Sequence, residues 1–317
     1  MARVIIGLDV AKDDLEACVR PADLRRSFPN TAAGIADLVA WAMSHAPERV
    51  VCESTGPYQK AAVAALLAAG LPAVTVNARQ VRDFAKSLGQ LAKTDRLDAA
   101  VIAQFGDVIP TTVRPLPPAD LLELQGLFDR RGQLVRMLAA EKNHRHAARL
   151  TGPGLVRNID RHIAFLERQI ADLEGRMDQL VDASEAFREQ NTLLRSITGV
   201  GPQVARTLIA YLPELGQRTR QAITALVGLA PFNDDSGRHT GQRHIRGGRH
   251  KVRLGLYQAA VSAIRHCPRM RAFYASLKAR GKASKVAIIA VARKILVLAN
   301  ALLRDKRSYR APANSVC

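Results

Sequence analysis

Short apolar runs and longer amphipathic stretches alternate along the first 110 residues. Residues 3–10 form a continuous apolar run rich in Val and Ile that predicts a buried strand, residues 14–20 fit a second strand in a hairpin with it, and residues 49–55 and 71–77 predict two more strands. Four stretches with apolar residues at helical spacing predict helices, at residues 34–46, 58–70, 78–89 and 94–106. Strands that alternate with helices after an initial hairpin indicate an α/β domain with a mixed sheet.

Four prolines, at positions 110, 115, 117 and 118, interrupt this pattern and predict a boundary near residue 110. Residues 119–149 and 156–190 are predicted as two long helices, separated by the helix-breaking TGPG at 151–154. Apolar residues recur at spacings of four and three along the second helix, which is the seam of a coiled coil: Ile159, Ile163, Leu166, Ile170, Leu173, Met177 and Leu180. The seam fits either an antiparallel hairpin within one chain or a contact between two chains.

The last part of the chain is predicted to be mainly helical and begins with a glycine turn. Gly199 and Gly201 flank Val200 directly before a helix that starts at Pro202, which resembles a helix-hairpin-helix element. Such a turn exposes backbone N–H groups to a nucleic-acid phosphate at a helix N-terminus, although many ordinary turns share the pattern. We therefore divide the chain into residues 1–110, 111–190 and 191–317.

Excess basic charge is confined to the last of these parts. The chain has 47 Lys and Arg against 28 Asp and Glu, a formal net charge of +19. The first 190 residues contain 24 of each kind, which leaves 23 basic and 4 acidic residues for positions 191–317. Clustered Arg favours a polyanion, first of all nucleic acid. An anionic membrane surface is the weaker alternative, because the basic residues lack an aromatic-rich opposite face.

The composition argues against several other classes of protein. Hydrophobic residues make up 48% and charged residues 24% of the chain, as in globular proteins. No charge-free apolar run reaches the roughly 18 residues of a membrane span, and the N-terminal apolar run is too short for a signal peptide. The four cysteines form no CxxC pair, which predicts reduced thiols, no zinc site and a cytoplasmic location: Cys18, Cys52, Cys267 and Cys317.

Four acids of the first part are candidate metal ligands. Asp9 and Glu53 lie at the ends of predicted strands, where the solvation of a charged face does not explain them. Asp95 and Asp98 are three residues apart on one face of a predicted helix. Carboxylates that converge at one rim of a sheet provide the oxygen ligands of Mg²⁺ or Mn²⁺, and two such ions support phosphoryl transfer. Alternatively, the helical pair only compensates the helix dipole after a Thr94 cap, and the strand-end acids only cap loops.

A serine inside a Gly- and Arg-rich segment is the candidate nucleophile. Ser236 precedes Gly237, and six basic residues follow within eighteen positions: Arg238, Arg243, Arg246, Arg249, Lys251 and Arg253. A hydroxyl among guanidinium groups suits attack on a phosphodiester, with Arg stabilising the charged transition state. In the alternative interpretation this is a solvated basic loop whose serine only caps a turn. Three histidines fit no standard metal-ligand spacing and are predicted to be further phosphate donors: His239, His244 and His250.

Several stretches of the chain carry a resemblance to a known family. IGLDVAKDDLEACV, VCESTGPY and KTDRLDAAVIAQF resemble the N-terminal domain of the DEDD insertion-sequence transposases, the insertion-sequence one-ten family. ITGVGPQVARTLIAYLPEL and LVGLAPFNDDSGRHTGQRHIRGGRHKVRLGLYQAA resemble the C-terminal transposase domain of that family. The resemblance implies an RNase H-like (RuvC-like) fold for residues 1–110. It also implies that Ser236, in the SG motif, forms a covalent link to DNA, and that four acids form the metal site: Asp9, Glu53, Asp95 and Asp98.

We therefore expect a DNA transposase or site-specific recombinase that cuts and rejoins strands of its own insertion sequence and of a target. The resemblance further implies a structured non-coding guide RNA and a homo-oligomer, a dimer or tetramer, in which the acids of one subunit can complete a site with the serine of another. We expect a cytoplasmic, nucleoid-associated protein without membrane contact. Two alternatives stay open: a Holliday-junction-type metal-dependent endonuclease without serine chemistry, and a non-catalytic nucleic-acid-binding protein. Lys93 and Arg96 have no assigned role.

Overall fold

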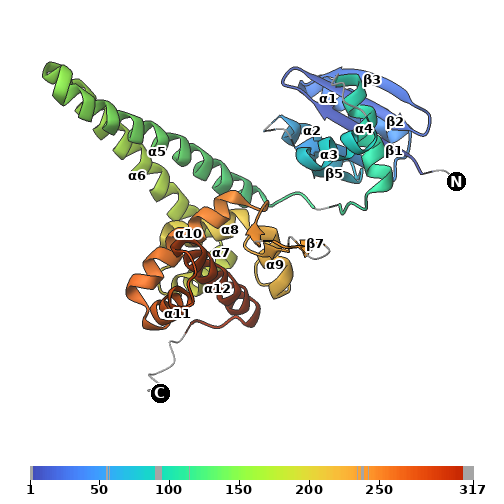
Figure 1. The fold of residues 1–317 in the computed structure, drawn as a ribbon. Coiled ribbons are helices and arrows are strands. Elements are labelled where there is room, and N and C mark those ends of the chain that lie inside the picture. The colour runs from blue at the N-terminus through green and yellow to red at the C-terminus, as the bar shows by residue number, and fades with distance from the viewer. Residues whose placement is uncertain are drawn as a thin grey trace. The chain divides into compact units, whose positions relative to one another are not determined.

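The fold is described from a computed structural model of the 317-residue chain. The described residues are 3–54, 56, 58–89, 95–113, 115–233, 235–236, 239–241 and 243–309, and the side chains at 95–97, 151, 153, 235–236 and 239–240 lie outside the description. The chain divides into two compact units, Met1–Pro117 and Pro118–Cys317 (Figure 1).

The first unit contains a five-stranded mixed sheet in the order β3-β2-β1-β4-β5 (Figure 1). β1 (Ile5–Val10) pairs antiparallel with β2 (Asp14–Arg20), which pairs antiparallel with β3 (Leu24–Pro29). β1 also pairs parallel with β4 (Arg49–Ser54), and β4 pairs parallel with β5 (Ala73–Asn77). The four predicted strands and the mixed sheet of an α/β unit are thereby confirmed.

The hydrophobic pattern does not predict β3. Its sequence, LRRSFP, has five exposed residues, and Phe28 alone is buried. An edge strand is held by backbone hydrogen bonds to its one neighbour and needs no continuous apolar face, and its charged side chains discourage pairing with a further strand. An exposed charged edge strand therefore escapes a prediction that relies on apolar periodicity.

Four helices cover the two faces of this sheet. α1 (Ala32–Ser44) and α2 (Gln59–Ala68) pack on one face, and α3 (Ala78–Ser87) and α4 (Asp95–Val108) pack on the other. Successive side chains of a strand point to opposite faces, so the apolar residues of β1 contribute to both clusters. The four predicted helices are confirmed, with ends that differ by a few residues from those expected.

The second unit begins with a long helical hairpin. α5 (Ala119–Thr151) and α6 (Val156–Ala183) pack against each other, and Figure 1 shows them projecting together from the remaining helices. A short 3-10 turn, Pro153–Leu155, joins them. The predicted hairpin is therefore present, and the seam of α6 packs against α5 of the same chain. The predicted second helix is too long, because Ser184 ends it and caps a separate helix, α7 (Glu185–Arg195).

Five further helices follow in the second unit: α8 (Pro202–Tyr211), α9 (Arg220–Val227), α10 (His250–His266), α11 (Pro268–Ala279) and α12 (Ser284–Asp305). Their buried faces form one hydrophobic core together with the start of α5 and the end of α6. The base of the hairpin is therefore packed into the same core as the basic C-terminal helices. The assignment of separate roles to residues 111–190 and 191–317 stays a prediction.

Among the described residues, α12 alone is long and apolar enough to cross a membrane by length and composition. Its middle carries Arg293 and Lys294, and its buried residues pack against α7, α9, α10 and α11. The Lys294 ammonium lies 4.0 Å from the centre of the Phe273 ring of α11. We interpret α12 as a core helix of the second unit.

Candidate active site

Asp9 and Glu53 lie on two neighbouring parallel strands at the C-terminal edge of the sheet. β1 and β4 pair in register up to Leu8 opposite Cys52, so the next residue on each strand is one of these two acids. Side chains at matching positions of paired strands point to the same face, with the strands about 4.8 Å apart. Both acids are half-buried, and Asp9 Oδ1 accepts a hydrogen bond of 3.0 Å from the backbone N–H of Val10.

α4 packs directly on the backbone of β1 at Gly7. A Cβ atom at this glycine would lie 2.2 Å from the carbonyl oxygen of Ala99 and 2.3 Å from the backbone nitrogen of Ala103. Such distances are far below van der Waals contact, so any larger residue would force the helix away from the strand. The small residues of both elements therefore set the height of α4 above the sheet.

The contacts of α4 also fix its direction. Gly106, near its end, lies against the side chain of Ile5 at the start of β1, whereas the earlier turn lies over the middle of that strand. α4 therefore runs antiparallel to β1, and its first turn is directed to the edge of the sheet that carries Asp9. That turn contains Asp98, which is half-buried, and Asp95, whose side chain lies outside the described atoms.

The pKa of the buried thiol of Cys52, next to Glu53 on β4, is raised above its ordinary range. Burial raises this pKa most, and the nearby charges of Asp9 and Glu53 raise it further. Asp9 and Glu53 supply oxygen donors at this edge, the chemistry that a hard divalent cation requires. Among the described residues, no group of three or more His, Cys, Asp or Glu side chains is placed to hold a metal ion, a statement that leaves out the Asp95 side chain.

Ser236 lies in two nested β-ladders, which we call the serine hairpin (residues 231–245). In the outer ladder β6 (Pro231–Phe232) pairs with β9 (His244–Ile245), and in the inner ladder β7 (Asp235–Ser236) pairs with β8 (His239–Thr240). The side chain of Ser236 lies outside the described atoms, as does the whole of residues 237 and 238. The segment predicted as a loop therefore contains four strands of two residues each, which are too short to leave a periodic signal.

The six basic residues predicted to contact nucleic acid differ in their surroundings. Arg238 lies outside the described residues, and Arg243 and Arg246 are exposed. Arg249, Lys251 and Arg253 are less or equally exposed at the surface and have bonds to groups of their own unit. Contact with nucleic acid stays a prediction for all six.

Lys251, Tyr211 and Asp129 connect α10, α8 and α5. The Tyr211 hydroxyl donates to Asp129 Oδ1 at 2.6 Å, while the Lys251 ammonium pairs with the same carboxylate and lies 4.5 Å from the centre of the Tyr211 ring. Burial and the hydrogen bond to Asp129 raise the pKa of Tyr211 above its ordinary range, so its hydroxyl stays protonated and remains a donor.

The sequence reasoning missed the acids that engage these cations. Glu214, which pairs with Arg249, is one of the 4 acidic residues among positions 191–317. An isolated acid in a strongly basic region is expected to neutralise a cation inside the fold, because burying either charge alone is unfavourable. That scarcity is a signal from which the role of Glu214 could have been predicted.

The two glycines of the predicted phosphate-binding turn have different surroundings. Gly199 has φ of +96°, and a Cβ atom there would lie 2.5 Å from the carbonyl oxygen of Ala259 in α10. Gly201 is exposed, precedes the first turn of α8 and has nothing within 4 Å of its Cβ position. Gly199 is thus explained by its packing against α10, while phosphate binding by this turn stays a prediction.

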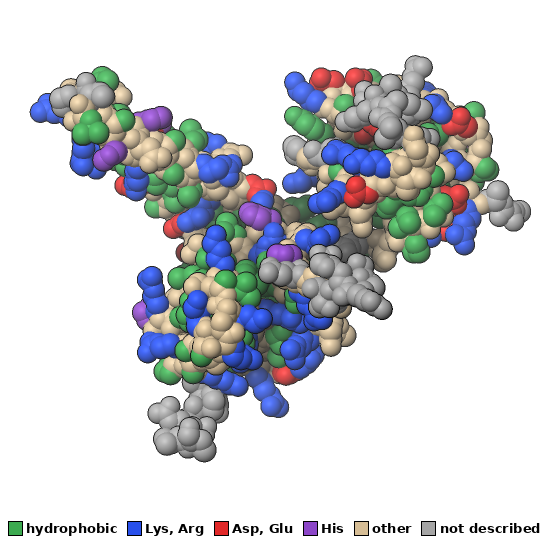
Figure 2. Space-filling view, in the orientation of Figure 1, with side chains coloured by type: hydrophobic (Ala, Val, Ile, Leu, Met, Phe, Trp, Pro, Cys, Tyr) green, Lys and Arg blue, Asp and Glu red, His purple; other side chains and the backbone are tan. Residues whose placement is uncertain are grey.

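Charge is distributed unequally over the two units. Figure 2 shows Lys and Arg side chains gathered over the visible face of the C-terminal helices with few acidic side chains between them, whereas the first unit shows both signs of charge. The excess positive charge of residues 191–317 is therefore displayed at the surface, where it can meet a polyanion.

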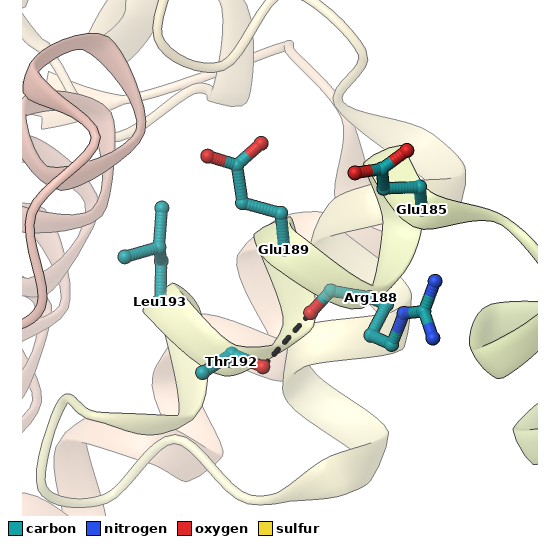
Figure 3. A pocket seen from close by; sticks show the side chains of 5 residues that line it. All are labelled: Glu185, Arg188, Glu189, Thr192 and Leu193. Atoms are coloured by element: carbon teal, nitrogen blue, oxygen red, sulfur yellow. Dashed lines mark hydrogen bonds between the residues drawn. The ribbon is translucent and has the colours of Figure 1, made fainter.

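A shallow hollow on α7 does not belong to this basic surface. Its volume is about 300 Å³, and Figure 3 shows that all the labelled side chains come from one helix: Glu185, Arg188, Glu189, Thr192 and Leu193. The Thr192 hydroxyl donates to the backbone carbonyl of Arg188 at 2.9 Å. Two carboxylates beside one guanidinium disfavour a phosphate, so we leave this hollow out of the candidate site.

Two family models match the chain. Residues 6–150 match a DEDD model of the IS110 type, described as "Transposase", and residues 191–275 match one described as "Transposase IS116/IS110/IS902 family". The chain belongs to the IS116/IS110/IS902 family of transposases. This IS110-family transposase is thus an enzyme of the DNA transposase and recombinase class, as the resemblance predicted. The first match spans the four candidate acids, and the second spans Ser236.

Individual relatives agree with this assignment. The pilin gene-inverting protein of Moraxella bovis is 24% identical over 319 residues, which cover 98% of each chain. An uncharacterized 44.8 kDa protein of insertion element IS116 from Streptomyces clavuligerus is 29% identical over 46% of this chain and 38% of its own length. An uncharacterized 42 kDa protein of insertion element IS900 from Mycobacterium paratuberculosis is 27% identical over 75% of this chain and 60% of its own length.

Proposed function

We propose that this IS110-family transposase cuts and rejoins DNA with two groups of residues, one in each unit. Asp9, Glu53, Asp95 and Asp98 would hold Mg²⁺ or Mn²⁺ on an RNase H-like (RuvC-like) fold, and Ser236 would be the nucleophile. The observation that supports this most is the direction of α4, whose acidic first turn is aimed at the sheet edge that carries the two strand-end acids. The whole of residues 1–110 would then serve as the acidic catalytic domain.

The carboxylates of the first unit suit the binding of a divalent cation, which when bound would act as a Lewis acid on a phosphate oxygen. Asp9 and Glu53 come from neighbouring strands of one sheet, so the backbone positions of the two acids are fixed relative to each other. Asp98 approaches from the packed helix above them. DEDD transposases use such an ion, and the placement of Asp9 and Glu53 on neighbouring strands supports the same use here.

Ser236 would form a phosphodiester with the cut strand. Its Oγ attacks the phosphorus while the bond to the leaving DNA oxygen breaks, and that oxygen takes up a proton. Attack by a DNA hydroxyl on the same phosphorus reverses the step, rejoins a strand and returns the proton to the serine. The energy of the cut bond is thereby kept in the protein–DNA link. Two exposed cations, Arg243 within the serine hairpin and Arg246 directly after it, suit the developing phosphate charge.

Further parts of the proposal rest on the family alone. The family implies a structured guide RNA that pairs with donor and target, and a dimer or tetramer in which the acids of one subunit meet the serine of another. Residues 191–317 would provide the nucleic-acid-binding surface, and the hairpin of residues 111–190 would contribute to assembly. A cytoplasmic protein bound to the nucleoid fits these roles.

Trapping of covalent adducts tests the proposal. A plasmid that carries the coding region and its flanking DNA is incubated with the protein and Mg²⁺, with and without its co-purified RNA, and adducts are resolved on a denaturing gel. Wild-type protein should form an adduct that Ser236→Ala cannot form. Persistent cutting by Ser236→Ala would favour a junction-resolving nuclease that uses only the acids. Unchanged integration by both Asp9→Asn and Asp98→Asn would favour a non-catalytic nucleic-acid-binding protein.

Inversion of a DNA segment is a second candidate reaction. It is supported by the match to a pilin gene-inverting protein along 98% of both chains. A plasmid in which the element ends lie in inverted or in direct orientation separates the two reactions. An invertase would reverse the segment between inverted ends without releasing it, whereas a transposase would transfer it to a second plasmid.

A further inference from the structure

The structure ties the end of the serine hairpin to the surrounding helices through one residue. Arg249, the N-cap residue of α10, forms a two-pronged ion pair with Glu214, with Nη1–Oε2 and Nη2–Oε1 distances of 2.5 and 2.6 Å. The Arg249 side chain is 26% exposed and the Glu214 side chain is 13% exposed. The pair is therefore largely shielded from water, where such a fork is stronger and more directional than at the surface.

Arg249 also bonds to two neighbouring helices. Its Nη1 donates to the carbonyl oxygen of Tyr211 at the end of α8, at 2.8 Å. Its backbone N–H donates to the carbonyl oxygen of Leu226 in α9, at 3.2 Å. This one residue thus joins α8, α9 and the start of α10, four positions after the last strand of the hairpin.

The start of the hairpin is fixed against its end by direct backbone contact. A Cβ atom at Gly228, the C-cap of α9, would lie 2.3 Å from the carbonyl oxygen of Gly247, and one at Gly248 would lie 2.3 Å from the nitrogen of Gly228. The Arg253 guanidinium bridges this contact, because it donates to the carbonyls of both Val227 and Gly247. The chain therefore enters and leaves the serine hairpin at one place, where Gly228 contacts Gly247 and Gly248.

Arg249 is less exposed than Arg243 and Arg246 of the same segment. Both of its terminal nitrogens already donate to oxygen atoms of the protein. Turning the guanidinium toward a DNA phosphate would loosen its two bonds to the Glu214 carboxylate, which is only 13% exposed, and weakening such a shielded ion pair is unfavourable. The geometry therefore favours a role toward the hairpin over a role toward DNA.

We infer that Arg249 and Glu214 are positioning residues, which set the direction of the serine hairpin so that Ser236 meets the phosphodiester. The inference rests on the proposed role of Ser236 as the nucleophile. A displacement of about 1 Å of a reacting group can reduce a rate about 100-fold without a loss of binding. A hairpin that pivots at its root should therefore bind DNA as before and react slowly.

Glu214→Gln is the most informative variant. It removes the negative charge that pairs with Arg249, and it cannot remove a phosphate contact because a carboxylate does not bind phosphate. We expect the rate of adduct formation to fall about 10- to 100-fold. DNA affinity should stay unchanged or increase, since the variant is one charge more positive. Amide hydrogen exchange of β6 and β9 should become faster. Arg246→Gln is the matched control, three residues before Arg249: it should weaken DNA binding and leave hydrogen exchange of the hairpin as in the wild type.

Exchange of the two charges adds an independent test. Arg249→Glu and Glu214→Arg should each slow adduct formation, and the double variant should recover part of the rate because the ion pair is rebuilt. If Arg249 instead contacts DNA, its replacement by an acid repels DNA whether or not Glu214 is changed. Arg249→Lys keeps the charge and loses the fork, so we expect it to slow the reaction without weakening DNA binding.

The outcomes separate this inference from the proposed function. Adduct formation by Ser236→Ala would overturn the proposed nucleophile. If Ser236→Ala forms no adduct while Glu214→Gln reacts at the wild-type rate, the positioning role alone is wrong. A loss of DNA affinity in Arg249→Lys, or no recovery in the double variant, would also overturn it. Circular dichroism establishes whether each variant is folded. If Glu214→Gln is unfolded, the rate and DNA affinity of Arg249→Lys decide whether the pair positions the hairpin.

Discussion

The packing of α4 on Gly7 makes a quantitative prediction for Gly7→Ala. The new Cβ would lie 2.2 Å from the carbonyl oxygen of Ala99, whereas ordinary contact begins near 3.4 Å. The helix would have to move away from the strand by about 1.2 Å, the difference between these distances. Both close atoms belong to helix backbone, so no side-chain rotation can relieve the contact.

This displacement should lower both the stability of the first unit and its activity. Overpacking of a core costs about 1–3 kcal/mol, and the rigid backbone contact places Gly7→Ala at the upper end of this range. The displaced helix also carries Asp98 away from Asp9, so under the proposed function the metal-dependent cleavage should fall by about 100-fold, beyond what the loss of stability explains. Folded protein should remain the majority species in dilute buffer.

Trp41 provides a selective probe of this unit. It is the single tryptophan of the chain and lies in α1, with its ring centre 5.5 Å from that of Phe28. Urea unfolding followed by its fluorescence should show a lower midpoint for Gly7→Ala. Gly175→Ala, in α6 with nothing within 4 Å of its Cβ position, is the control and should leave this midpoint unchanged. A wild-type midpoint and wild-type cleavage in Gly7→Ala would refute the argument that α4 places Asp98 by close contact.

Three further predictions concern stability, pH and salt. Asp178→Ala should destabilise the second unit by about 2 kcal/mol, because it leaves the Arg206 cation, which is 5% exposed, without this ion pair. The cost is below that of breaking a fully buried pair because Asp178 itself is 57% exposed. An unchanged urea midpoint, measured by helical circular dichroism, would contradict this. Burial and the hydrogen bond to Asp23 raise the pKa of Cys18 to about 11 from 9.0. Between pH 9 and 11 the unfolded thiol loses its proton while the folded thiol keeps it, so the stability of the first unit should fall as the pH rises. In Cys18→Ala, the stability measured by Trp41 fluorescence should depend less on pH in this range. The logarithm of the DNA association constant should fall by about 0.9 for each phosphate contact when the salt concentration rises tenfold. Arg246→Ala should reduce this salt dependence by about one contact. An unchanged salt dependence would show that Arg246 contacts no phosphate.

Much of the fold follows from apolar periodicity alone. The four predicted strands and four predicted helices of the first unit are present, because each buries a continuous apolar face that leaves a periodic signal. β3 lacks such a face, and the break at Ser184 depends on a cap that a continuous heptad pattern hides. The exact boundaries and the edge strand are thus set by hydrogen bonds that a single sequence does not display.

The candidate site was predictable only in part for a related reason. Strand-end acids such as Asp9 and Glu53 stand out because a charge at the end of a buried strand is unusual. The six basic residues after Ser236 look alike in sequence, yet Arg249, Lys251 and Arg253 bond to specific groups of their own unit. Composition counts charge, whereas the direction in which a basic side chain turns depends on acids distant in sequence, such as Glu214 for Arg249 and Asp129 for Lys251.

The two candidate groups of this transposase are positioned by the same physical means. In the first unit, Gly7 allows a helix to rest on strand backbone and so brings an acidic turn toward a sheet edge. In the second, Gly228 and Gly248 allow two chain segments to touch through their backbones at the root of the serine hairpin. Backbone contact leaves no side-chain rotamer to adjust, so it fixes distances more tightly than packing between side chains does. The proposed reaction joins a phosphorus atom to a defined oxygen and needs that accuracy, so the proposed function would give these glycines a catalytic role in addition to their structural one.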